Sequence, residues 1–170
     1  PMNYKWTYED PKPEEAAAAA LLARETGVHP ALGRLLRRRG ITTTAEAKRF
    51  FRPHLTDLHD PFLMNDMQKA VDRLNAALCR NERILVYGDY DVDGCTAVAL
   101  VYKFLVKFYS NIDFYIPDRY DEGYGISKKG VDFAAECGVK LIIVLDCGIK
   151  AVDEIAYAKS LGIDFIICDH

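Results

Sequence analysis

The chain has 170 residues, of which 50% are hydrophobic and 28% are charged, and its net charge is −3. This length suits one domain, or one domain with an appendage, and the composition is typical of a soluble globular protein. No run of about 18 apolar residues occurs, so no membrane-spanning helix is expected. The first residues lack the apolar core of a signal peptide, so secretion is not expected either.

Five cysteines lie along the chain, and no two of them form a CxxC pair. An odd number of cysteines without such pairs favours buried, reduced thiols in a cytosolic protein over a disulfide framework. The same spacing disfavours a structural zinc site.

Positive charge is concentrated between Arg34 and Arg52. This stretch has seven basic residues against the single acid Glu46, so the other 151 residues carry −9 by subtraction from −3. A basic lobe beside an acidic one is typical of a nucleic-acid enzyme whose acids bind metal. A solvated helix face has the same pattern, and both interpretations stay open.

Helix signals dominate the first third of the chain. Pro13 can open a helix at its first turn, Gly27 can end it, and Thr43 or Thr44 can cap a later one. Three helices are therefore expected, over residues 14–25, 30–39 and 44–51. A connector without periodicity follows from Arg52, and we place a domain boundary there, between a helical region of residues 1–60 and a second domain of residues 61–170.

The second domain has the pattern of an α/β fold. Asp66 can cap a helix that begins at Met67, and from Arg83 onward short apolar runs alternate with helical segments. The expected strands are 84–87, 114–116, 141–145 and 165–167, and the expected helices are 96–108, 128–136 and 151–160. Because the strands are apolar throughout, they predict a parallel sheet with helices on both faces.

Acidic residues follow all four predicted strands. In chain order these residues are Asp89, Asp91 and Asp93, then Asp118, Asp121 and Glu122, then Asp146, and finally Asp169 with His170. The carboxyl ends of parallel strands share one edge of the sheet, where ligands bind. Crowded carboxylates repel one another unless a cation lies between them. Oxygen ligands with one imidazole suit Mn²⁺ or Mg²⁺ better than zinc, so a divalent-metal site is predicted.

Two other acidic motifs share part of this pattern. The calcium loop of an EF-hand also begins Asp-x-Asp-x-Asp-Gly, but it needs a Glu where this chain has Leu100. The phosphatases related to haloacid dehalogenase share the Asp91–Gly94 pattern, but they leave Asp89 and the terminal Asp169–His170 without a role. The glycine-rich nucleotide motifs are absent. Cys95 and Cys147 are more simply packing residues than nucleophiles.

Residues Ile84–Gly94 closely resemble the first motif of the DHH phosphoesterases, in its RecJ form. Val144–Ile149 resembles the second motif, and Cys168–His170 resembles the third without its last histidine. The stretch Ile116–Gly125 resembles a segment typical of RecJ rather than of the smaller members of the family.

The resemblance implies a bacterial, cytoplasmic exonuclease that degrades single-stranded DNA from 5′ to 3′ with Mn²⁺ or Mg²⁺, in DNA repair and recombination. It implies single-stranded DNA as the substrate, and a single-strand DNA-binding protein and a RecQ-type helicase as partners. It also implies that residues 61–170 are the N-terminal part of a DHH domain that stops at the third motif. We therefore expect a fragment with weak or no nuclease activity by itself.

A two-metal site is the mechanism we expect from these residues. Asp91 and His170 would bind one ion, Asp93 the other, and Asp146 would bridge them. Asp89 and Asp169 would complete the catalytic set by orienting ligands or water.

Four residues of the Ile116–Gly125 stretch are candidates for binding DNA. Arg119 can hold a phosphate, Tyr124 can stack on a base, and Gly123 and Gly125 let the backbone approach a strand. An Asp118–Arg119 ion pair with a packed Tyr124 is the structural alternative.

Two other functions stay open. One is a small-substrate DHH phosphoesterase, such as a pyrophosphatase, an oligoribonuclease or a cyclic-dinucleotide hydrolase. The other is a non-catalytic acidic-pocket module, such as a phosphoacceptor receiver or a metal-dependent binding domain.

Overall fold

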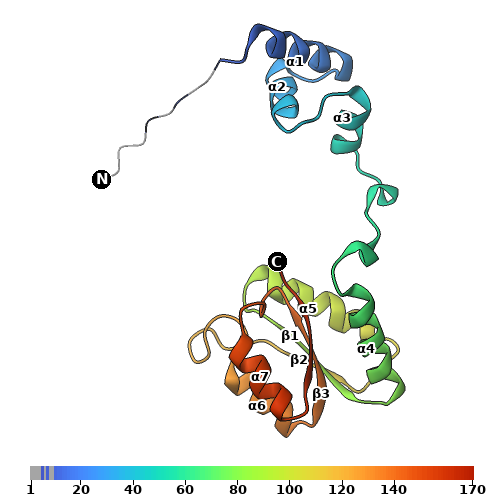
Figure 1. Cartoon of the computed structure of the whole chain (residues 1–170), viewed down its shortest axis with the longest axis vertical. Helices are drawn as coiled ribbons and strands as arrows, with labels where there is room; N and C mark the ends of the chain where they lie inside the picture. Colours follow the sequence, from blue (N-terminus) through green and yellow to red (C-terminus); the bar gives the residue numbers. More distant parts are fainter. Residues whose placement is uncertain (1–4, 6, 8–9) are drawn as a thin grey trace. The chain divides into compact units, whose positions relative to one another are not determined.

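The computed structural model describes residues 5, 7 and 10–170 of the chain (Figure 1). The chain divides into two compact units between Asp60 and Pro61. Within the described residues, no helix is both long and apolar enough to cross a membrane.

The N-terminal unit is built from three helices, as the sequence predicted: α1 (Pro13–Thr26), α2 (Pro30–Arg38) and α3 (Thr44–Phe51). Gly27 ends α1 in the left-handed conformation, with φ at 70°. Thr43 caps α3 by accepting a hydrogen bond from the Glu46 amide, and the Glu46 carboxylate accepts one from the Thr43 amide in return. Buried Leu22, Leu36 and Ala47 form a small core where the three helices meet.

Two short 3₁₀ turns occupy the segment that the sequence predicted as irregular: η1 (Leu55–Asp57) and η2 (Pro61–Leu63). Helix α4 (Met67–Cys79) then opens the second unit. Asp66 precedes the helix, as predicted, but it does not cap it. Its φ is 58°, and its side chain makes no capping hydrogen bond. In this left-handed conformation, the backbone turn rather than the carboxylate starts the helix.

A four-stranded parallel sheet forms the centre of the second unit, which confirms the predicted α/β fold. Its strands are β1 (Arg83–Gly88), β2 (Ile112–Tyr115), β3 (Val139–Leu145) and β4 (Asp164–Cys168). They lie in the order β2-β1-β3-β4, so the two most apolar strands are central. Both faces of β1 and β3 are buried, which explains why neither strand alternates between apolar and polar residues.

Helices cover both faces of this sheet (Figure 1). Helices α4 and α5 (Val92–Leu105) pack on the face that contains Ile84, Val86 and Ile143. Helices α6 (Lys128–Glu136) and α7 (Val152–Ser160) pack on the face that contains Leu85 and Ile142. The carboxyl ends of the strands therefore lie together at one edge, where the acidic residues were predicted.

Helix α5 begins four residues earlier than the sequence predicted, at Val92 instead of Thr96. The Asp91 side chain accepts a hydrogen bond from the Gly94 amide at 2.9 Å and so caps the helix immediately after β1. The helix also ends at Leu105, before the predicted Phe108. The predicted cap of α6 is confirmed, since the Ser127 hydroxyl accepts from the Gly130 amide.

Candidate metal centre

The turn from β1 into α5 carries the first three acids of the candidate site. Gly94 presses α5 against this turn, because a Cβ there would lie 2.5 Å from the Asp89 carbonyl oxygen. Asp91 caps the helix, and exposed Asp93 lies in its first turn. The helix N-terminus carries a partial positive charge that favours these two carboxylates.

Asp89 is fully buried at the end of β1, unlike its two exposed neighbours in the motif. Its Oδ1 accepts a hydrogen bond from the Gly125 amide at 3.3 Å, and its buried Oδ2 has no partner among the described residues. An unpaired buried carboxylate oxygen is costly, so it marks a place where a positive or donating group belongs. Asp89 also ties β1 to the loop between β2 and α6.

Asp146 follows β3 in a left-handed backbone conformation, with φ at 60°. Few residues other than glycine adopt this conformation, and here the Asp146 amide is held by the Cys168 carbonyl of β4 at 2.9 Å. Burial raises the pKa of the Asp146 carboxyl, and so do the neighbouring Asp91 and Asp93 carboxylates, while His170 acts in the opposite direction. Three of the predicted metal ligands therefore lie close enough to Asp146 to act on its charge.

Asp169 braces the turn that follows β3. Its Oδ2 accepts from the Ile149 amide at 2.9 Å, and its Oδ1 accepts from the His170 amide at 2.8 Å. Both carboxylate oxygens are thus engaged by backbone, which holds the ends of β3 and β4 together. The His170 side chain is exposed beside them.

The acids that follow β2 do not join the site, which corrects the expectation that all four strands contribute. Asp118 accepts hydrogen bonds from the Tyr120 and Asp121 amides at 2.8 and 3.0 Å. Glu122 accepts from the Tyr115 hydroxyl and the Asp118 amide, both at 2.9 Å, and from the Ser127 hydroxyl. These carboxylates hold the loop together because its backbone amides have no strand or helix partners.

The same loop brings Gly125 and Tyr124 to the acidic edge. Gly125 has φ at 86°, and its carbonyl accepts a hydrogen bond from the buried Tyr87 hydroxyl at 3.0 Å. The exposed Tyr124 donates through its hydroxyl to the Asp146 carbonyl at 3.4 Å. Gly123 is also left-handed, with φ at 81°, and open space surrounds both glycines where a Cβ would lie. The four loop residues predicted to bind DNA thus lie on one segment, and two of them, Tyr124 and Gly125, contact acids of the candidate site.

Tyr90 is a feature of this edge that the sequence interpretation missed. The Arg119 guanidinium lies 5.2 Å from the centre of the Tyr90 ring, and the Tyr124 ring meets Tyr90 edge-to-face at 6.4 Å. No Asp118–Arg119 ion pair occurs in the described part of the chain, so Arg119 stacks rather than pairs. The sequence signal that could have identified Tyr90 is an aromatic residue between two acids, Asp89 and Asp91.

The DHH family N-terminal domain matches residues 83–170 of this chain, which is more than half of it. The chain belongs to the DHH family. It is 39% identical over 166 residues to the single-stranded-DNA-specific exonuclease RecJ of Bacillus subtilis, covering 98% of this chain and 21% of that protein. The exonuclease RecJ of Escherichia coli is 37% identical over 142 residues, covering 83% and 24% of the two chains.

Two solved structures share the DHH fold of this chain. A RecJ in complex with Mn²⁺ from Thermus thermophilus has a TM-score of 0.68 and 25% identity, covering 91% of this chain and 21% of that one. An exonuclease RecJ bound to manganese has a TM-score of 0.58 and 33% identity, covering 63% and 28%. The resemblance to DHH proteins of the RecJ form is confirmed, and the chain spans 21–24% of the length of these curated relatives.

The candidate metal donors follow strands that end at the same edge of the sheet. Within the described residues, no three His, Cys, Asp or Glu side chains lie close enough to hold a metal ion as placed. Asp91 instead caps α5, and Asp169 is taken up by two amides. The donor chemistry nevertheless fits Mn²⁺ or Mg²⁺, because carboxylates gather around Asp146 and the buried Asp89 oxygen lacks a partner among the described residues.

Cys147 lies inside this cluster and is no nucleophile. The side chain is buried, and burial together with the nearby carboxylates of Asp89 and Asp169 raises the pKa of its thiol to about 12. At neutral pH the thiol therefore stays protonated, whereas cysteine reactivity requires the thiolate. Cys95 donates a weak hydrogen bond from Sγ to the Asp89 carbonyl at 3.8 Å, in keeping with a packing role. The expectation that the thiols are buried is wrong for Cys79 and Cys168, which are exposed.

Proposed function

We propose that this chain is the N-terminal part of a DHH nuclease that hydrolyses phosphodiester bonds of single-stranded DNA from 5′ to 3′. The observation that carries the proposal is the sheet topology, because the parallel strands β1, β3 and β4 lie side by side and bring the acids that follow them, together with His170, to one edge. Relatives that are named single-stranded-DNA-specific exonucleases support it, as do similar structures that contain manganese.

The proposed centre uses Mn²⁺ or Mg²⁺ at two positions. Asp91 and His170 would hold one cation and Asp93 the other, with Asp146 between them. When bound, the cations would lower the pKa of an attacking water and neutralise charge on the phosphodiester. Carboxylate repulsion around Asp146 supports this assignment, because a cation bound among these carboxylates would relieve it.

The remaining residues of the edge position these groups. Asp169 joins the turn after β3 to the end of β4 by accepting from the Ile149 amide, and Asp89 fixes the Gly125 loop beside them. Both would act in catalysis by holding the ligands and the strand in place. Arg119 and Tyr124 would take the DNA strand at the mouth of the site, one through a phosphate and the other through a base.

We further propose that residues 61–170 form the first part of a DHH phosphoesterase domain, and that residues 1–60 form a separate helical region. The resemblance to RecJ suggests action in the bacterial cytoplasm, in DNA repair and recombination. It also suggests a single-strand DNA-binding protein and a RecQ-type helicase as partners.

Because the chain spans 21% of the Bacillus subtilis RecJ, we test the proposed function in a chimera with that protein. Residues 1–170 would replace the matching segment of that protein, and the product would be incubated with 5′- and 3′-labelled single-stranded DNA, pyrophosphate and short RNA. We expect Mn²⁺-dependent release of nucleotides from the 5′ end of DNA and none with a chelator. Preferential hydrolysis of pyrophosphate or short RNA would instead support the small-substrate phosphoesterase.

A further inference from the structure

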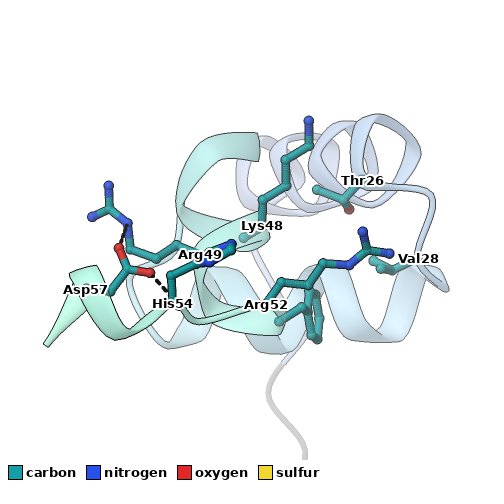
Figure 2. A pocket seen from close by; sticks show the side chains of 9 residues that line it. Thr26, Val28, Lys48, Arg49, Arg52, His54 and Asp57 are labelled. Carbon is teal, nitrogen blue, oxygen red and sulfur yellow. Dashed lines mark hydrogen bonds and ion pairs between the residues drawn. The ribbon is translucent and has the colours of Figure 1, made fainter.

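The N-terminal unit contains a cavity of about 730 Å³ that the DHH site does not use. It lies between the end of α1, helix α3 and the η1 turn (Figure 2). Its volume is within the range of about 300–1,000 Å³ that is usual for small-molecule sites. It is therefore large enough for a nucleotide, not merely for a single small ion.

Basic side chains line this cavity, and they differ in whether an acidic side chain pairs with them. Arg49 pairs with Asp57 at 3.3 Å, and Asp57 also accepts a hydrogen bond from the His54 amide at 2.9 Å. The side chains of Lys48 and Arg52 have no ion pair or hydrogen bond within the part of the chain that the structure describes. In Figure 2 both extend away from the Arg49–Asp57 pair, on the side of Thr26 and Val28. Two positive charges on one wall of a cavity favour an anionic ligand.

The same cavity also has an apolar wall with an aromatic ring. Phe51 lines it at 45% exposure, together with Val28 and buried Ala47. The adjacent Phe50 holds the Phe51 ring edge-to-face at 5.5 Å. The exposed part of the ring offers a flat apolar face, and a nucleic-acid base is a partner that stacks on such faces.

We propose that this cavity binds one nucleotide of single-stranded DNA, with its phosphate at Lys48 and Arg52 and its base against Phe51. The proposal rests on the proposed function, because it takes the strand that the DHH site would hydrolyse as its ligand. It adds a second DNA-binding site, on the helical unit. Cations beside an aromatic ring match the alternation of phosphates and bases along a strand, whereas an acidic peptide matches only the cations.

Binding of fluorescent oligo-dT to the 170-residue chain in chelator tests the phosphate contacts without hydrolysis. Lys48→Gln/Arg52→Gln should weaken binding about tenfold or more, since each lost phosphate contact removes electrostatic affinity. Arg38→Gln/Arg39→Gln removes the same charge from exposed residues of the same basic segment outside the cavity, and it should weaken binding less than about threefold. Equal weakening by the two double variants would overturn the site in favour of diffuse attraction.

The base contact is tested separately with Phe51→Leu, which keeps an apolar side chain but removes the ring. It should weaken binding of oligo-dT about fivefold or more and leave an abasic strand of the same length unaffected. Equal effects on the two strands would refute the base contact.

A polyglutamate peptide that competes as well as oligo-dT would refute the nucleotide ligand and point to an acidic protein partner. Thermal unfolding of each variant verifies that the helical unit is folded. Lys48→Arg/Arg52→Lys keeps both positive charges and should bind oligo-dT like the parent chain.

These outcomes are independent of the nuclease test. If the chimera degrades DNA while Lys48→Gln/Arg52→Gln binds like the parent chain, the cavity proposal fails and the nuclease proposal stands. If the chimera is inactive while that variant loses binding selectively, the nuclease proposal fails and the cavity remains a nucleotide site.

Discussion

Asp146 is the residue on which the proposed DHH centre depends most. Its left-handed backbone is held by β4, and its carboxyl lies among the charges of Asp91, Asp93 and His170. In the absence of a cation, this crowding opposes ionisation of the Asp146 carboxyl. The arrangement therefore favours cation binding at the expense of folding stability.

Replacing Asp146 with alanine should abolish hydrolysis by the chimera while leaving the fold intact. The loss should be at least about a thousandfold, because cation stabilisation of the reacting phosphodiester is worth several kcal/mol. Release of labelled nucleotides with Mn²⁺ measures activity, and circular dichroism melting measures the fold. Glu136→Ala, at the exposed end of α6, is the matched control. An active, folded Asp146→Ala chimera would disprove the assignment.

The buried thiol of Cys147 should resist alkylation. With its pKa at about 12, only about one thiol in ten thousand is ionised at pH 8. Iodoacetamide followed by mass spectrometry should therefore show modification of the exposed Cys79 and none of Cys147, until urea unfolds the chain. Modification of Cys147 as fast as Cys79 in the folded protein would contradict the burial and would reopen the question of a cysteine nucleophile.

At this scale the sequence predicted where acids occur but not how each one is used. The apolar runs that end at Tyr87, Leu145 and Ile167 were sufficient to place acids at one sheet edge. The burial of Asp89 and the positive φ of Asp146 depend on loop packing from distant segments, which no local pattern encodes. That these residues bind metal stays a prediction.

At the scale of elements, the loop between β2 and α6 determines how the residues that we propose to bind DNA are held. Glu122 is its main acceptor, with donors from Tyr115, Asp118 and Ser127. The sequence predicted that the acids after β2 reach the shared edge of the sheet, since it could not show that loop amides compete for carboxylates. The early start of α5 was missed for a similar reason, because an Asp that caps a helix looks like an Asp in a loop.

Replacing Glu122 with glutamine should loosen this loop and lower the free energy of unfolding by about 1–2 kcal/mol at pH 7, through weaker hydrogen bonds. Burial acts to raise the pKa of Glu122, but hydrogen bonds from Ser127, Asp118 and Tyr115 outweigh it and bring the pKa below its ordinary value of 4.5. The stabilisation is therefore complete above pH 4.5 and is lost as the pH falls through the lowered folded value.

Urea unfolding between pH 7 and pH 3 checks this dependence. The difference between the parent chain and Glu122→Gln should stay constant down to about pH 5 and shrink below about pH 4. Glu136→Gln, in an exposed position on α6, should show no such change. A difference that grows on acidification would mean that Glu122 is not held as an ionised acceptor.

At the scale of the whole chain there are two units, for which we propose different tasks. The helical unit carries the basic segment and the proposed nucleotide cavity, whereas the second unit carries the acidic edge of the sheet. The hydrophobic pattern of the sequence predicted the helices of the first unit and the sheet of the second. It could do so because a helical period and a continuous apolar strand are both visible within a short stretch of sequence. The cavity was not foreseen, since it forms where the end of α1 meets α3 and η1.

Residues 61–170 should fold alone and keep the metal response of the whole chain. Both hydrophobic layers of the sheet lie within this unit, so removing residues 1–60 exposes none of their core. Mn²⁺ at a hundred times its dissociation constant should stabilise both chains equally, by about 2.7 kcal/mol per site. Thermal unfolding with Mn²⁺ and with chelator measures this shift, and Asp146→Ala should remove it from both. A shift that disappears on truncation alone would mean that the helical region contributes to the metal site, which would contradict the division of tasks between the two units.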